Sequence, residues 1–210
     1  MRTPEDMNSS LELKAGSWML LVGPSSLNTS LLRGIAHLPA LGPQAQAPAL
    51  GPQAQAPALG SRAQSGEHAG VHVLDGGNRF NGYTLARAAC GRQEILNRIT
   101  VARAFTCYQM LALLESTPAS EGPFVILDLL RTFYDESVQA GERKRLLRAC
   151  IAQMQRLEQA GGGLVSVHPP ALASPAAIEL LGMLQEAAAD TFFVQPPLMA
   201  AGLPKQMRMF

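Results

Sequence analysis

Short apolar runs alternate with amphipathic segments along most of the chain. Runs of four or five apolar residues predict buried strands, and apolar residues recurring every three or four positions predict helices. Strands are expected at 18–22, 71–74, 100–105, 124–128, 164–167 and 191–194, with weaker signals at 11–14 and 206–210. Helices are expected at 27–37, 83–89, 108–114, 142–159 and 175–189, with a helix or turn at 92–99. This alternation predicts an α/β fold in three layers, with a mostly parallel sheet between two layers of helices.

Polar residues follow several of the predicted strands directly. The segment 23–30 follows the first strand, and Asp75, Asp128 and His168 follow three later ones. Sheets of this kind bind ligands beyond the carboxyl ends of their strands. These residues are therefore expected to line one crevice.

A perfect nine-residue repeat interrupts this pattern after the first predicted helix. PALGPQAQA occupies residues 39–47 and again 48–56, and a third copy begins at Pro57. A segment so rich in Pro, Gly, Ala and Gln cannot bury enough apolar surface to offset its ordering entropy. We interpret residues 39–70 as a disordered insertion in a surface loop, with a polyproline docking site as the alternative.

Deletion of residues 39–60 tests this interpretation. If the repeat is a disordered insertion, the deletion should leave the thermal unfolding midpoint almost unchanged, because no packed surface is lost. Differential scanning calorimetry of the full-length and deleted chains makes the comparison. A drop of many degrees would show that the repeat is part of the fold.

Composition restricts the cellular setting more than the activity. The chain has 210 residues, 47% hydrophobic residues and a net charge of +1, which suits one α/β domain and gives no bulk charge toward nucleic acid. The odd set of Cys90, Cys107 and Cys150 lacks metal-ligand spacing and suits a reducing compartment. The polar residues 1–10 do not resemble a signal peptide, and no run of apolar residues approaches membrane-spanning length. We expect a cytoplasmic protein, or a nuclear one if it is eukaryotic.

The first predicted strand, loop and helix follow the layout of a phosphate-binding loop, G-x-x-x-x-G-K-[ST]. Gly23 and Ser30 occupy the first and last positions of that template, whereas Asn28 replaces its second glycine and Thr29 its lysine. The residues predicted to surround a nucleotide are Gly23, Pro24, Ser25, Ser26, Leu27, Asn28, Thr29 and Ser30.

The two replacements weaken this predicted site without removing it. Backbone N–H groups and the helix N-terminus can still attract phosphate, Ser30 could bind Mg²⁺, and Asp128 could support the metal as a Walker B carboxylate. Thr29 has no charge, and losing a charge-assisted contact costs ~1.5–3 kcal/mol, roughly a 10- to 150-fold loss in affinity. We therefore expect ATP and Mg²⁺ to bind weakly or not at all. In the alternative, the loop only connects strand to helix and Asp128 is a capping or solvated carboxylate.

Basic residues cluster at the start of the longest predicted helix. Arg143, Lys144, Arg145 and Arg148 lie there, and Arg131 precedes them. The cluster is either a solvated helix face or a patch that contacts DNA phosphates.

Several segments together resemble the RecA-type recombinase core, especially the archaeal and eukaryotic strand-exchange proteins and their paralogs. The segment VARAFTCYQML is the most specific match, because no general phosphate-loop rule predicts it. The resemblance implies a RecA-like P-loop domain over 11–210, interrupted by 39–70 and preceded by a flexible N-terminus at 1–10. The matching segments are 16–23, 73–75, 101–111, 124–128, 164–168 and 191–194.

The departures from that family affect its catalytic positions. By the resemblance, Gly77 stands in place of the catalytic glutamate, Thr29 in place of the lysine, and His168 or Pro169 in place of the sensing glutamine. The resemblance therefore implies a non-catalytic or weakly nucleotide-binding paralog. It would act in DNA repair or recombination through a recombinase-like partner subunit or a homo-oligomer, with DNA contact at Arg131 and Arg143–Arg148. The alternatives are an ATPase completed in trans by a neighbouring subunit, and a scaffold that binds neither nucleotide nor DNA.

Overall fold

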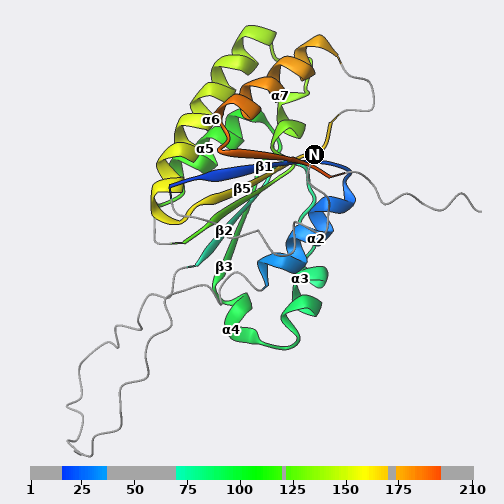
Figure 1. The fold of residues 1–210 in the computed structure, drawn as a ribbon, viewed down its shortest axis with the longest axis vertical. Helices are drawn as coiled ribbons and strands as arrows, with labels where there is room; N and C mark the ends of the chain where they lie inside the picture. The colour runs from blue at the N-terminus through cyan, green and yellow to red at the C-terminus, as the bar shows by residue number, and fades with distance from the viewer. Residues whose placement is uncertain (1–15, 37–69, 120–121, 170–173, 195–210) are drawn as a thin grey trace, which may run out of the picture.

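The computed structural model describes residues 16–36, 70–119, 122–169 and 174–194. Within these ranges, six strands form one sheet, accompanied by six α-helices and one 3-10 helix (Figure 1). All strand pairs are parallel, so the α/β prediction is confirmed and the sheet is wholly rather than mostly parallel. The strands predicted at 11–14 and 206–210, and the repeat, lie outside the described residues.

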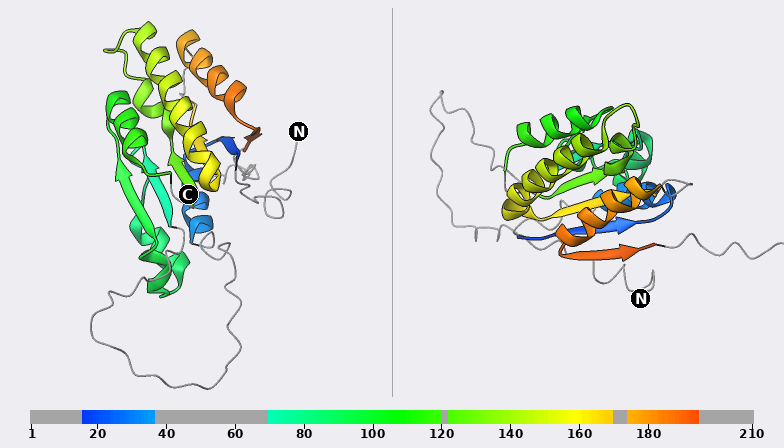
Figure 2. Two further views of the ribbon diagram at one scale, coloured as in Figure 1. Left: turned by 90° about the vertical axis from the view of Figure 1, so that its left-hand side faces the viewer. Right: turned by 90° about the horizontal axis from the view of Figure 1, so that it is seen from above.

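The strand order in the sheet is β3-β2-β4-β5-β1-β6. Figure 2 shows β6 beside β1 at one edge, and β3 forms the other edge. The order places β5 and β6 on either side of the first strand, although both are far from it in the sequence. The strands are β1 Trp18–Val22, β2 Val71–Asp75, β3 Ile99–Arg103, β4 Phe124–Leu127, β5 Gly163–Val167 and β6 Asp190–Phe193.

Helices cover both faces of the sheet, which gives the three predicted layers (Figure 1). One face carries α2 (Ser26–Ile35), α3 (Gly82–Ala89) and the short α4 (Gln93–Leu96). The opposite face carries α5 (Cys107–Ser116), α6 (Ala140–Gly161) and α7 (Pro175–Ala187). Their bounds lie within a few residues of the predicted ones.

The core divides into two apolar clusters, one on each side of the sheet. Leu20 and Ile126 belong to the cluster under α5, α6 and α7, whereas Leu21 and Leu127 belong to the cluster under α2 and α3. Neighbouring residues of one strand therefore face opposite helix layers. This arrangement explains why the strands read as continuous apolar runs, since parallel sheets are buried on both faces.

One side of α5 faces the core. Cys107, Met110 and Leu114 are the buried residues of this helix, whereas Leu111 and Leu113 are only partly buried. Thr106 caps the helix by accepting a hydrogen bond from the N–H of Gln109. Helical residues four apart share one face, so Met110 and Leu114 set the orientation of α5.

No helix in the described ranges is long and apolar enough to cross a bilayer.

The burial of the cysteines predicts unequal thiol reactivity. Cys90 is exposed, whereas Cys107 and Cys150 are buried; burial raises the pKa of both buried thiols, that of Cys150 to about 12. The reactive thiolate is thus disfavoured at both sites. The folded chain should release one equivalent of chromophore with dithionitrobenzoate near neutral pH and three in urea, and a second fast thiol in the folded chain would contradict this packing.

Candidate functional site

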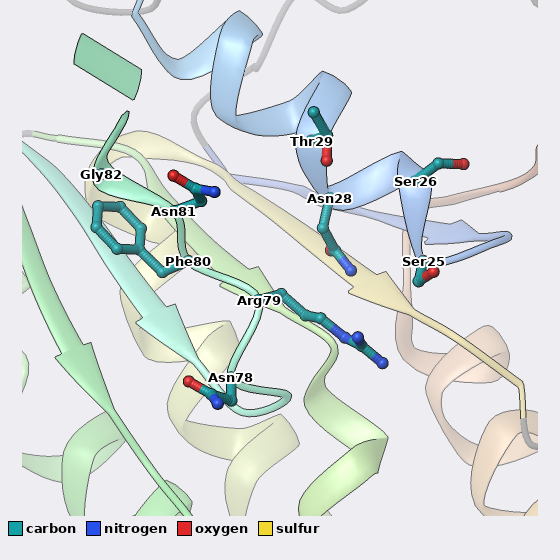
Figure 3. Close-up of a pocket in the computed structure, with 9 residues that line it drawn as sticks. All are labelled: Ser25, Ser26, Asn28, Thr29, Asn78, Arg79, Phe80, Asn81 and Gly82. Atoms are coloured by element: carbon teal, nitrogen blue, oxygen red, sulfur yellow. The ribbon is translucent and has the colours of Figure 1, made fainter. Parts of the chain in front are cut away.

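A polar cleft of about 610 Å³ lies at the carboxyl ends of the strands, between the start of α2 and the loop joining β2 to α3. Figure 3 shows the Arg79 side chain crossing the cleft below α2, with Asn28 above it. This is the edge of the sheet at which the sequence predicts a crevice. The lining residues are Ser25, Ser26, Asn28, Thr29, Asn78, Arg79, Phe80, Asn81 and Gly82.

The predicted phosphate loop is shorter than its template, because α2 begins at Ser26. The N–H of Leu27 donates to the Pro24 carbonyl at 2.9 Å, and the N–H of Asn28 donates to the Ser25 carbonyl at 3.2 Å. A phosphate would need such N–H groups to point outward. Two of the predicted donors are therefore engaged within the loop itself.

Gly23 has a packing role that the template does not anticipate. A Cβ atom at this position would lie 2.9 Å from the carbonyl oxygen of Val194 and 3.0 Å from its Cβ. The N–H of Gly23 also donates to the Val167 carbonyl at 3.1 Å. The chain needs glycine here to pass closely beside the end of β6, whether or not a ligand binds.

Asn28 is buried in a hydrogen-bonded network instead of opening the loop as a glycine would. The Ser166 hydroxyl donates to Asn28 Oδ1 at 2.6 Å, and the N–H of Asp128 donates to the Ser166 hydroxyl at 2.9 Å. Only 3% of Asn28 is exposed, and Ser166 is equally buried. Because buried polar groups require partners, this network joins α2 to the ends of β4 and β5.

Half of the residues of the predicted phosphate loop line the cleft. Of the eight predicted nucleotide contacts, Ser25, Ser26, Asn28 and Thr29 line the cleft, and the other four do not. Ser30 is exposed and lies beyond the first turn of α2.

Asp128, the predicted Walker B carboxylate, is almost fully buried and already partnered. Its Oδ2 accepts from Arg79 Nε at 3.1 Å, and its Oδ1 accepts from the N–H of His168 at 3.1 Å. Its backbone is left-handed, with φ 53. Asp tolerates this conformation better than most residues. Asp128 is therefore neither a solvated carboxylate nor a side-chain helix cap; it is the buried partner of Arg79, which lines the cleft. Asp75, Asp128 and His168, all expected in the crevice, are not among the residues that line it.

Asp75 fixes the loop that carries Arg79. It is fully buried and accepts from the N–H groups of Arg79 and Phe80 at 2.8 and 3.0 Å, and from Arg103 Nε at 3.0 Å. Hydrogen bonds to a carboxylate are stronger than those between neutral groups. The β2–α3 loop is therefore held so that the Arg79 side chain reaches across to Asp128.

His168 joins two strand ends on the opposite side of Asp128. Its Nδ1 lies 3.0 Å from the Gly23 carbonyl oxygen. Since a carbonyl oxygen only accepts, Nδ1 carries the proton in this contact. The ring thus bridges the end of β5 to the start of the predicted phosphate loop, which is a structural role.

Gly77 leaves no space for a side chain. A Cβ atom there would lie 2.5 Å from Asp128 Cβ and 2.6 Å from its Oδ2. A glutamate at this position would displace Asp128 or the loop. The position that the resemblance gives to a catalytic acid is filled by the neighbouring carboxylate.

The predicted metal ligands do not form a Mg²⁺ site as they stand. Both Asp128 oxygens accept hydrogen bonds from protein donors, and Ser30 lies outside the cleft lining. No group of three or more His, Cys, Asp or Glu residues converges within the described ranges. Coordination by Asp128 would require the Arg79 contact to break.

The basic cluster of α6 is largely engaged by protein partners. Arg145 makes two hydrogen bonds to Glu142, Lys144 pairs with Glu179, and Arg143 Nη1 donates to the Phe133 carbonyl at 3.2 Å. Arg131 and Arg148 are exposed, and no ion pair among the described residues involves them. Two of the five predicted DNA contacts thus lack a competing acid.

Arg79 and Ser166 are functional-site residues that the sequence reasoning missed. Ser166 is a polar residue inside an apolar strand, and Arg79 follows a strand-end aspartate by four positions. Those signals were present, but neither pattern specifies which side chain it will meet.

No family model matches this chain, and no curated protein is significantly similar to it.

Replacement of Gly77 by alanine tests the packing of the site. The added methyl group overlaps Asp128, so G77A should lower the free energy of unfolding by about 1–3 kcal/mol, as overpacking does. G182A is the matched control, because a Cβ atom at Gly182 in α7 meets nothing within 4 Å and alanine is favoured in a helix by ~0.5–1 kcal/mol. Urea unfolding measures both, and equal stability of G77A and the parent chain would contradict the close contact.

Proposed function

We propose that this chain is a RecA-like recombinase paralog that binds nucleotide weakly or not at all and does not hydrolyse it. It would act in DNA repair or recombination through a recombinase-like partner subunit or a second copy of itself. The observation that carries the non-catalytic part of this proposal is the ion pair between buried Asp128 and Arg79 of the cleft wall, and the family assignment rests on the sequence resemblance. Arg79 pairs with the carboxylate of Asp128, which a hydrolytic site would need to support its metal ion.

Three features around this ion pair argue against turnover. Phosphoryl transfer depends on a metal, a cation at the phosphates and a group that orients the attacking nucleophile. Here Asp128 is paired, Thr29 brings no charge, and Gly77 has no room for a carboxylate. The deficiencies lie at three different residues, so no single substitution restores the set.

Weak phosphate binding is still compatible with the cleft. Arg79 is about one-third exposed and lines the cleft together with Ser26 and Thr29. Its guanidinium has donors beyond the Nε that pairs with Asp128, because the group carries five N–H bonds in a planar fork. Arg79 could thus contact a bound phosphate from the wall of the cleft opposite Thr29, which stands at the lysine position of the template.

A partner-binding role is supported by exposed apolar side chains on and shortly after β3, which is an edge strand among the described residues. Phe105 is 70% exposed and Tyr108 is 51% exposed, and Val101 on the edge strand is also exposed. Exposed apolar patches mark interaction surfaces, and an edge strand offers unpaired backbone groups. This surface also supports the scaffold alternative, in which neither nucleotide nor DNA binds.

Calorimetry of the purified chain with ATP and ADP tests the nucleotide part of the proposal. Any binding should be equal with Mg²⁺ and with a chelator, because Asp128 is not free to support the metal. R79Q should weaken binding roughly 10- to 150-fold through loss of a charged donor, while R79K retains more affinity. R148Q, on the distant α6, is the control and should bind like the parent chain.

The competing readings give different results in the same experiment. Mg²⁺-dependent binding that D128N abolishes, or phosphate release by the chain alone, would overturn the non-catalytic proposal. Turnover only after a partner subunit is added would favour completion in trans. Absence of heat at millimolar nucleotide would leave the partner-binding pseudo-ATPase or scaffold.

A further inference from the structure

A second hollow lies beside the cleft, between α2 and α3 on the same face of the sheet. Its volume is about 350 Å³, and it is lined by Arg33, Tyr83, Thr84, Arg87 and Ala88. Arg33 comes from α2 and the other four come from α3. None of the site residues predicted from the sequence lies in it.

The charge of this hollow has one sign. Its lining contains two arginines and no acidic residue, and the lining of the neighbouring cleft also lacks Asp and Glu. Arg33 and Arg87 are exposed, and no ion pair among the described residues involves either. On α6, by contrast, Lys144 and Arg145 are neutralised by glutamates. Among the described residues, the α2–α3 groove therefore presents positive charge that no acid pairs with.

Tyr83 is the most exposed large hydrophobic residue described, at 71%. The Arg87 guanidinium carbon lies 5.6 Å from the centre of its ring, within the range of a cation–π interaction. This contact holds one face of the ring and leaves most of the side chain open to solvent. A flat ligand group could stack on the tyrosine while the arginines meet its charge.

The groove and the cleft have lining residues that follow one another along both helices. Thr29 of the cleft and Arg33 of the groove lie four residues apart on α2, and Gly82 of the cleft precedes Tyr83 of the groove. Residues four apart lie on one helix face, about one turn from each other. A linear ligand could thus run from Arg79 to Arg33 and Arg87.

We propose that the α2–α3 groove binds single-stranded nucleic acid, with Arg33 and Arg87 on phosphates and Tyr83 stacked on a base. This inference deepens the proposed function, because it assigns the DNA contact to a face other than the basic cluster of α6. Grooves that combine backbone-tracking positive charge with exposed aromatic rings bind unpaired strands with little sequence preference. An acidic peptide would use the arginines but not the tyrosine face, and duplex DNA would keep its bases stacked away from Tyr83.

Fluorescence anisotropy with a labelled deoxythymidine oligomer of about 20 nucleotides tests this, since single-strand sites span ~4–16 nucleotides per binding domain. No nucleotide or partner is added, so the result is independent of the calorimetric test. R33A/R87A should lower the slope of log affinity against log salt by about 1.4, at ~0.7 for each phosphate contact. Y83A should weaken binding about 5- to 100-fold, and Y83F should restore it because the ring remains.

The rival basic cluster is tested by R131A/R148A, which removes two exposed arginines, at or near α6, that the resemblance assigns to DNA contact. It should leave both the affinity and the salt slope unchanged. All five chains are compared by thermal melts, and their exposed positions make equal midpoints the expectation. The inference is overturned if R131A/R148A lowers the slope and R33A/R87A does not, or if the parent chain fails to bind the oligomer at low salt. It is also overturned if polyglutamate competes as well as the oligomer and Y83A has no effect, which would assign the groove to an acidic protein.

Discussion

The buried carboxylate of Asp128 is the group around which the strand ends are arranged. Ionised carboxylates are costly to bury without partners, and this one meets the cost through Arg79 and the His168 N–H while its own N–H reaches Ser166. Arg79 lies in the loop after β2, Ser166 lies within β5, and His168 directly follows β5. Its influence extends to Tyr134, whose pKa is raised by burial and secondarily by the negative charge of Asp128. One carboxylate thus fixes several chain segments that would otherwise be free to separate.

The same arrangement limits the chemistry of the cleft. A carboxylate that holds an arginine is poorly placed to hold a metal, and a glycine packed against it cannot be exchanged for an acid. The strand, loop and helix keep the layout of a phosphate-binding site, but the carboxylate of Asp128 makes contacts within the protein that stabilise the fold. Arg79 is the exception, because its partly exposed guanidinium belongs both to the buried ion pair and to the cleft wall. Anion recognition without turnover is the chemistry that such a wall supports.

The two faces of the sheet also differ in how their charged side chains are paired. On α6, Lys144 and Arg145 pair with glutamates, whereas Arg33 and Arg87 of the α2–α3 groove are in no ion pair among the described residues. Exposed charge acts over about a Debye length, ~8–10 Å at physiological salt, so the pairing of nearby charges decides how much of it is felt in solvent. The basic cluster that is densest in the sequence is therefore partly neutralised within the fold. Density in the chain measures the number of charges and not their pairing.

The local pattern of the sequence determined the elements themselves. Five-residue apolar runs such as Trp18–Val22 form strands, and Leu146, Leu147 and Cys150 lie on the buried face of α6. These elements follow from the local pattern because the spacing of apolar residues depends only on burial. Only the tertiary structure decided the partners of the polar residues. Asn28 and Ser166 are 138 residues apart in the chain, and Arg79 and Asp128 are 49 apart; one strand order brings them together. Apolar burial is satisfied by any core, whereas an ion pair or a hydrogen bond needs one specific atom at one distance, which no local pattern specifies.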